Sequence, residues 1–128
     1  MPSQEKQAKK ILIADDDDRF SAMIKSALEQ AGFDITQAID GEEAVAQAKA
    51  VHPNLILLDI MMPKKLGFEV LEELKAGADT KNIPIITISH LAQPSDTEKA
   101  KQLGAVEHLI KTDFSIRGLI DKIREYVE

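Results

Sequence analysis

The sequence predicts an α/β protein in which helices cover both faces of one five-stranded parallel sheet, a doubly wound arrangement. Short apolar segments alternate with amphipathic helical segments five times along the chain. This alternation is typical of parallel strands joined by right-handed helical crossovers. Three of the apolar segments are also rich in Ile, Leu or Val without polar interruption, as in strands that are buried on both faces.

Each predicted strand is a short apolar run, and each predicted helix is an apolar stripe at spacings of three and four residues. In chain order, the predicted strands are Ile11–Ala14, Phe33–Ala38, Leu55–Leu58, Ile83–Ser89 and His108–Ile110. The helical stripes that follow them span Phe20–Leu28, Ala44–Ala48, Phe68–Leu74, Ala100–Leu103 and Leu119–Val127.

Capping residues mark where several helices should begin and end. Asp40 with Glu43 is an acidic cap for the second helix, and Ser95 with Glu98 is a capping-box candidate for the fourth. Glycines at positions 32, 77 and 104 follow the first, third and fourth stripes, where they would end those helices.

Composition limits the class of protein. A chain of 128 residues suits one domain. The net charge of −6 and a pI near 5.1 argue against nucleic acid or an anionic membrane as the main partner. The absence of cysteine excludes disulfides and thiolate chemistry, and no apolar run approaches the ~20 residues of a membrane span. Because no secretion signal is present either, we expect a cytoplasmic protein. Residues 1–9 are polar and aperiodic, so we expect them to form a flexible leader.

Charged and polar side chains follow four of the five predicted strands. Asp15 and Asp16 follow the first strand, Asp59 follows the third, Ser89 ends the fourth and Lys111 follows the fifth. In an open parallel sheet, ligands bind beyond the carboxyl ends of the strands. We therefore expect these five side chains to gather at one edge of the sheet.

Three carboxylates beside one ammonium group favour a cation site. All-oxygen ligands suit a hard ion such as Mg²⁺, and a metal beside a lysine and a hydroxyl is suited to phosphoryl chemistry. Asp15 and Asp16 would hold the ion, whereas Asp17 and Asp18 would begin the next helix, where acids favour the helix dipole. Asp59 itself could receive the phosphoryl group, since aspartyl phosphates are known covalent intermediates.

These segments resemble the receiver domain of bacterial two-component response regulators, in particular the stand-alone receivers of the chemotaxis type. The similarity covers about residues 9–127 and rests on four segments in family order: "ILIADDD", "LILLDIMMP", "IPIITIS" and "LGAVEHLIK". Gly67, eight residues after Asp59, also falls where the family has a glycine.

The resemblance implies a role for each residue of the cluster. Asp59 would accept a phosphoryl group from a phosphohistidine on a histidine kinase or phosphotransfer protein, Lys111 would pair with a phosphoryl oxygen, and Ser89 would hydrogen-bond another. Mg²⁺ would be bound by Asp15, Asp16, Asp59 and the backbone carbonyl of Met61.

The resemblance also implies a flavodoxin-like sheet with strand order 2-1-3-4-5 and a receiver domain over residues 10–128. Such a domain is a signalling module with at most self-dephosphorylation, not an enzyme. Phosphorylation would switch a face formed by the fourth strand, the fifth strand and the last helix. That face would bind a downstream protein or, in a homodimer, a second copy of the chain.

Four positions depart from the family pattern. Leu66 replaces a frequent aspartate, and His90 stands where a small residue is usual. His108 occupies the place of a switching Tyr or Phe, and Thr112 the place of a proline that often has a cis bond. A cis bond before a residue other than proline costs ~2.5–4 kcal/mol, so the bond before Thr112 is either trans or held cis by other contacts.

Two alternatives remain at this point. The chain could be a receiver-fold interaction module that is no longer phosphorylated, since function depends on the site and not on the fold. It could also be a phosphatase of the haloacid-dehalogenase type with Asp15 as the nucleophile. Arg19 and the short chain disfavour the phosphatase.

Overall fold

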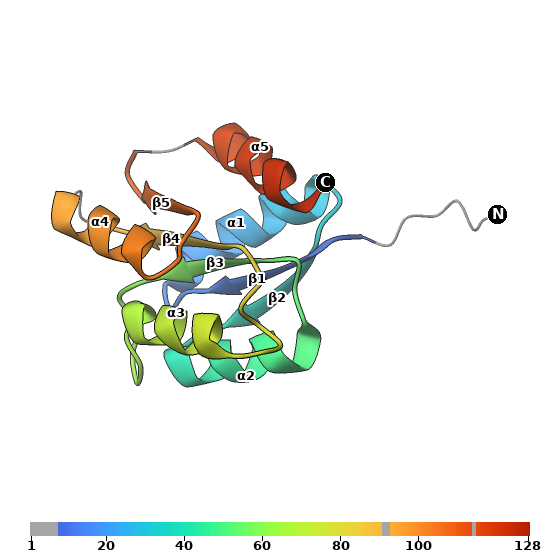
Figure 1. Ribbon diagram of the computed structural model, residues 1–128. Helices are drawn as coiled ribbons and strands as arrows, with labels where there is room; N and C mark the ends of the chain where they lie inside the picture. Colours follow the sequence, from blue (N-terminus) through green and yellow to red (C-terminus); the bar gives the residue numbers. More distant parts are fainter. Residues whose placement is uncertain (1–7, 91–92, 114) are drawn as a thin grey trace.

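The computed structural model describes residues 8–90, 93–113 and 115–128. Five parallel strands form one sheet in the order β2-β1-β3-β4-β5, which confirms the predicted fold class and strand order. Figure 1 shows the sheet between two layers of helices. The elements are β1 (Lys10–Ala14), α1 (Asp18–Gln30), β2 (Asp34–Ala38), α2 (Gly41–Val51), β3 (Leu55–Asp59), α3 (Gly67–Ala76), β4 (Ile85–Ser89), α4 (Pro94–Gln102), β5 (Glu107–Ile110) and α5 (Ile116–Val127).

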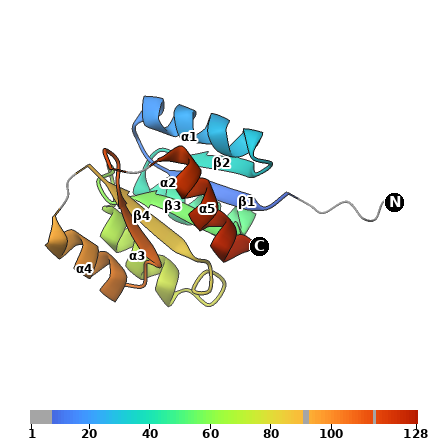
Figure 2. The ribbon, with the colours of Figure 1, turned by 90° about the horizontal axis from the view of Figure 1, so that it is seen from above.

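The sheet separates two hydrophobic cores. One core packs α2, α3 and α4 against one face of the sheet, and the other packs α1 and α5 against the opposite face. Figure 2 looks onto the sheet from above, with α5 in front of the strands. Successive residues of a strand point to opposite faces, so in β3 Ile56 and Leu58 join the first core while Leu55 and Leu57 join the second. Every residue of β3 is buried, as expected for the central parallel strand.

Most of the predicted helix boundaries are confirmed, with one correction. Asp17 caps α1, and the Asp40 carboxylate accepts a hydrogen bond from Glu43 N–H at the start of α2. The fourth helix does not use Ser95 as its cap, because it begins one residue earlier at Pro94, with Gln93 as the N-cap. Proline suits the first turn of a helix, where its fixed φ is helical and no N–H is needed.

Strand boundaries shift by one or two residues from the apolar runs. β2 begins at Asp34 and β4 at Ile85, whereas β5 begins at Glu107. The Ile83 N–H is hydrogen-bonded to Thr80 O in a turn, which explains why this apolar residue is not part of β4. Hydrophobicity therefore located the strands, and the backbone hydrogen bonds determined their ends.

The amino-terminal leader remains a prediction. Residues 1–7 lie outside the described residues, and β1 begins at Lys10. Among the residues that the structure describes, no helix has the length and apolar character to cross a membrane.

Candidate functional site

Two buried carboxylates and one buried ammonium group meet at the carboxyl edge of the sheet. Asp59 is the last residue of β3, and Asp15 follows β1 next to it, since Ala14 pairs with Leu58. Lys111 follows β5 and extends past the end of β4. Its Nζ lies 2.9 Å from Asp15 Oδ2 and 3.2 Å from Asp59 Oδ2, and all three side chains are 4% exposed or less.

Backbone hydrogen bonds orient both carboxylates. Asp15 Oδ1 accepts from Asp17 N–H, and Asp59 Oδ1 accepts from Met61 N–H, each at 2.9 Å. The loop after each strand therefore binds one oxygen of the acid that precedes it, while the second oxygen faces Lys111. These contacts orient the two carboxylates toward one point at the edge of the sheet.

Lys111 is fixed by neighbours on both sides. Its backbone N–H donates to Ser89 O at 2.8 Å, and its ammonium lies 4.5 Å from the centre of the Phe20 ring, a cation–π distance. The sequence placed Phe20 only in the apolar stripe of the first helix. No sequence signal identified this ring as a neighbour of the site, because the contact joins residues 91 positions apart.

The electrostatics of the cluster follow from burial. Burial raises the pKa of Asp59 to about 6, and the neighbouring Asp15 carboxylate adds to the increase despite the hydrogen bond from Met61 and the attraction of Lys111. Burial by itself disfavours the ammonium of Lys111, yet its hydrogen bonds and its attraction to Asp15 and Asp59 raise its pKa overall. One ammonium is thus shared between two desolvated carboxylates.

Asp16 completes a set of oxygens that could bind a cation. Ligand oxygens of Asp15, Asp16 and Asp59 all lie within 4.8 Å of one another. Asp15 Oδ2 is buried and, apart from its ion pair with Lys111, accepts no hydrogen bond among the described residues. Asp16 is exposed, so the cluster has an open side. The donor set therefore fits a hard divalent ion such as Mg²⁺, which prefers carboxylates and retained waters.

Ser89 and Gly67 lie near the end of β3. Ser89 is buried as the last residue of β4, one position beyond Ile88, which pairs with Asp59. The Gly67 N–H donates to Ile60 O, and a Cβ at position 67 would lie only 2.3 Å from Ile60 Cα. Only glycine permits this close approach, which holds the start of α3 against the residue that follows Asp59.

The departures from the family pattern have distinct structural settings. His90 and Leu66 are exposed. His108 is partly buried in β5, where its Nδ1 lies 2.7 Å from Thr87 Oγ1. No peptide bond between described residues is cis, so the bond before Thr112 is trans.

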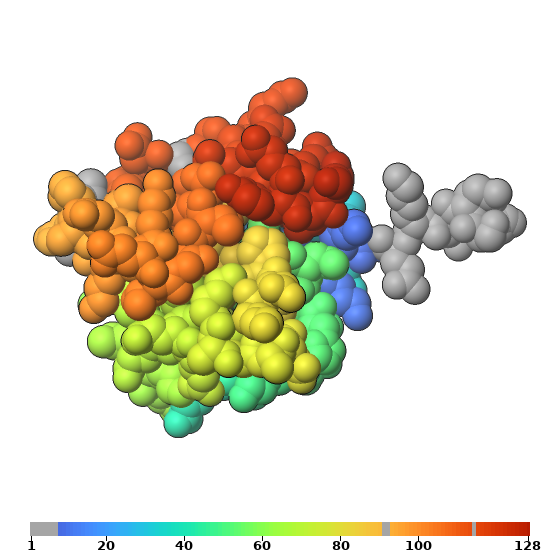
Figure 3. Space-filling view, in the orientation of Figure 1, coloured from blue at the N-terminus to red at the C-terminus, as the bar shows by residue number. Residues whose placement is uncertain are grey.

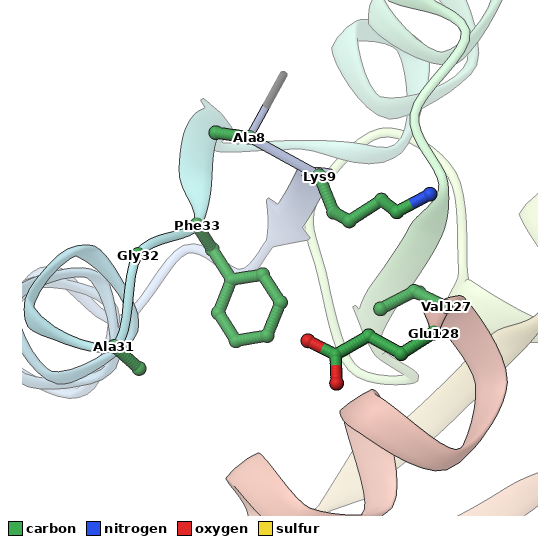
Figure 4. Close-up of a pocket in the computed structure, with 7 residues that line it drawn as sticks. All are labelled: Ala8, Lys9, Ala31, Gly32, Phe33, Val127 and Glu128. Carbon is green, nitrogen blue, oxygen red and sulfur yellow. The ribbon is translucent and has the colours of Figure 1, made fainter. Parts of the chain in front are cut away.

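A surface hollow lies at the other edge of the sheet. Its volume is about 730 Å³, and Figure 4 shows the Phe33 and Glu128 side chains extending into it. It is formed by the residues before β1 and β2 and by the end of α5. In the space-filling view of Figure 3, the end of α5 lies beside the start of β1. This hollow contains no residue of the acidic cluster.

Comparison with known proteins identifies the family. The family described as "Response regulator receiver domain" matches residues 11–124, nearly the whole chain. The chain belongs to the response regulator receiver family. This receiver domain is 39% identical over 118 residues to a probable transcriptional regulator, ycf27, of Porphyridium aerugineum, covering 92% of this chain and 48% of that protein. The chain thus spans about half the length of the first curated relatives it matches.

Other relatives are of similar length to this receiver domain. The polar-differentiation response regulator DivK of Brucella ovis is 30% identical over 93% of this chain and 96% of its own. The receiver domain of the sensor histidine kinase PA1611 from Pseudomonas aeruginosa superposes with a TM-score of 0.86 at 26% identity, covering 94% of this chain and 98% of that one. That structure was solved with a magnesium ion coordinated in its active site cleft.

Proposed function

We propose that this receiver domain is a phosphorylation-dependent switch in which Asp59 accepts a phosphoryl group from a phosphohistidine. One observation carries the proposal: the Asp59 carboxylate is buried at a strand end, 3.2 Å from the Lys111 ammonium and beside the Asp15 and Asp16 oxygens. This combination supplies a nucleophile, a fixed positive charge and oxygen ligands for a metal at one point.

The proposed transfer is a displacement at phosphorus. An ionised oxygen of Asp59 forms the new O–P bond, and the N–P bond breaks, so that the histidine nitrogen leaves with its electron pair. The pKa of about 6 leaves Asp59 largely ionised at neutral pH. Lys111 stabilises the charge on the phosphoryl oxygens, and Ser89 donates a hydrogen bond to one of them.

A magnesium ion, when bound, would neutralise charge on the acidic cluster and on the phosphoryl group. We assign its ligands as Asp15, Asp16, Asp59 and the carbonyl of Met61. The close approach of the three carboxylates supports this assignment, as does the magnesium ion described for the PA1611 receiver. The protein's own contribution is to keep Asp15 and Asp59 oriented through the N–H groups of the two following loops.

Phosphoryl uptake tests the function directly. Phosphoramidate, which carries an N–P bond, should phosphorylate the chain in the presence of Mg²⁺, and the product should be an alkali-labile, hydroxylamine-sensitive acyl phosphate. The Asp59→Asn variant should not react, whereas the exposed-site variant Asp79→Asn should react like the parent. Equal labelling of the parent and Asp59→Asn would refute the proposal. Labelling at Asp15 would instead favour the phosphatase mechanism.

The interaction-module alternative differs in its metal affinity. In an interaction module that is no longer phosphorylated, the site should bind Mg²⁺ weakly even though its carboxylates are present. In a receiver that is phosphorylated, the parent should bind Mg²⁺ and Asp16→Asn should bind it more weakly. Isothermal titration with Mg²⁺ separates the two. No contact among the described residues favours the interaction module over the phosphorylated receiver.

We propose that the phosphorylated form presents the surface of β4, β5 and α5 to a downstream protein or to a second copy of the chain. On this surface Glu107 of β5 contacts two side chains of α5, with its carboxylate 3.5 Å from Lys122 Nζ and 3.0 Å from the Tyr126 hydroxyl. These polar contacts are exposed or partly exposed and can be exchanged for contacts with a partner at little cost. Sedimentation of the chain with and without beryllofluoride and Mg²⁺ tests the homodimer.

A further inference from the structure

A hydrogen bond joins β4 and β5 beneath α4. Thr87 and His108 are directly paired in the sheet, and His108 Nδ1 lies 2.7 Å from Thr87 Oγ1. The Thr87 side chain is fully buried, and its hydroxyl is also 3.3 Å from the backbone oxygen of Glu107. The hydroxyl can therefore donate either to His108 Nδ1 or to the Glu107 oxygen, so both neutral tautomers of the imidazole satisfy Nδ1.

The second imidazole nitrogen has no such partner. His108 Nε2 is buried and forms no hydrogen bond with any described residue. A neutral ring tolerates this, because an unprotonated Nε2 leaves only one weak acceptor unsatisfied. A protonated ring would place a charged N–H donor in the same position, and an unpaired buried charge is much more costly. Burial accordingly lowers the pKa of His108.

The charged groups around the ring do not compensate for this cost. From α4, Asp96 attracts a charged imidazole and Lys101 repels it. From β5, the Glu107 side chain points to the opposite face, where it contacts Lys122 and Tyr126. Thr87 of β4, the hydrogen-bond partner of the ring, is uncharged.

Helix α4 is the element that can move to relieve an unpaired charge. Its sequence is PSDTEKAKQ: Ala100 is its only buried residue, and the others, apart from Pro94, are polar or charged. Lys99 adds a surface contact, with its Nζ 4.6 Å from the centre of the Phe68 ring. Strands β4 and β5, by contrast, are held by their shared backbone ladder. A segment with few buried contacts is where local opening is cheapest.

We propose that His108 makes the docking of α4 on the sheet sensitive to protons: the ring is neutral when the helix is docked and protonated when the helix is released. The ordinary pKa of histidine, about 6.5, places this change near physiological pH. The docked state disfavours the protonated ring. The docked helix is therefore most stable, relative to the released helix, above the ordinary pKa of histidine, and it loses stability as the pH falls below that pKa. Each unit by which the docked pKa lies below the free value corresponds to about tenfold in the opening equilibrium.

The contact requires neither Mg²⁺ nor phosphorylation of Asp59, so its test is independent of the proposed function. Amide hydrogen exchange of the unphosphorylated chain in EDTA, corrected for intrinsic rates, should be measured from pH 8 to pH 5. Protection of residues 95–102 in α4 should fall as the pH drops, by up to about tenfold per pH unit, while protection of α2 stays constant. In His108→Phe, protection of α4 should not depend on pH.

Two further variants make the result specific to this histidine. Asp59 titrates in the same range, with a pKa of about 6, so Asp59→Asn must retain the pH response of α4. His108→Gln, a neutral side chain that can still hydrogen-bond Thr87, should lose the response and serves if the Phe variant does not fold. An equal pH response in the parent and His108→Gln would overturn the proposal, as would a flat response in the parent. An NMR titration that gives the His108 ring an ordinary or raised pKa would also overturn it.

Discussion

Replacing Asp59 by asparagine should stabilise the fold at neutral pH while it abolishes phosphorylation. Asp59 is only 2% exposed, and burial raises the pKa of its carboxyl from 3.8 to about 6. At 1.36 kcal/mol per pKa unit, the ionised side chain costs about 3 kcal/mol of folding free energy. The amide has nearly the same shape and carries no charge, and Lys111 keeps its ion pair with Asp15.

The extra stability of Asp59→Asn relative to the parent should increase with pH. Below pH 3.8 the carboxyl is protonated in both the folded and the unfolded chain, so the parent and the variant should be about equally stable. As the pH rises, the unfolded chain releases its proton first, and the parent loses stability relative to the variant. The difference should reach its full value of about 3 kcal/mol above pH 6.

Urea unfolding in EDTA at several pH values between 4 and 8 measures this difference. The matched control is Asp79→Asn, which makes the same chemical change at an exposed position and should alter stability by less than about 0.5 kcal/mol at every pH. Saturating Mg²⁺ should reduce the advantage of Asp59→Asn, because ligand binding stabilises the parent. The reasoning fails if Asp59→Asn is less stable than the parent at pH 7, or if the difference is the same at pH 4 and pH 8.

Three further substitutions test individual contacts. Lys111→Met leaves Asp15 and Asp59 without a counter-charge, so it should lower the free energy of unfolding by about 3–5 kcal/mol at pH 8. The loss should be smaller at pH 5, where Asp59 is protonated. Equal losses at the two pH values in urea unfolding would contradict this. Gly67→Ala places a Cβ 2.3 Å from Ile60 Cα, so it should cost about 1–3 kcal/mol and weaken Mg²⁺ binding by calorimetry; parental values for both would show that the close approach is unimportant. Asp17→Ala removes the acceptor for Arg19 and Phe20 N–H, and thermal unfolding should report a loss of about 1 kcal/mol. A large loss of Mg²⁺ affinity in Asp17→Ala would show that Asp17 is a ligand and not only a cap.

The sequence by itself predicted the alternation of strands and helices and the charged residues that gather at the carboxyl edge of the sheet. Strand and helix periodicities are local consequences of which side chains must be buried, so the alternation of five strands and five helices could be predicted from hydrophobicity alone. The acids at the ends of β1 and β3 and the lysine after β5 could be named because parallel strands bring their carboxyl ends to one edge. The strand order needed the family resemblance, since alternation of strands and helices is compatible with more than one order.

Tertiary structure decided how those residues interact. Lys111 reaches two carboxylates past the end of β4, with the Phe20 ring at cation–π distance from its ammonium. Distances of this kind depend on the packing of elements that are far apart in the chain. The pKa of Asp59 follows from loss of water, and so does the cost of a charge at the buried, unpaired Nε2 of His108. Desolvation is a property of the assembled structure, and no local pattern of residues contains it.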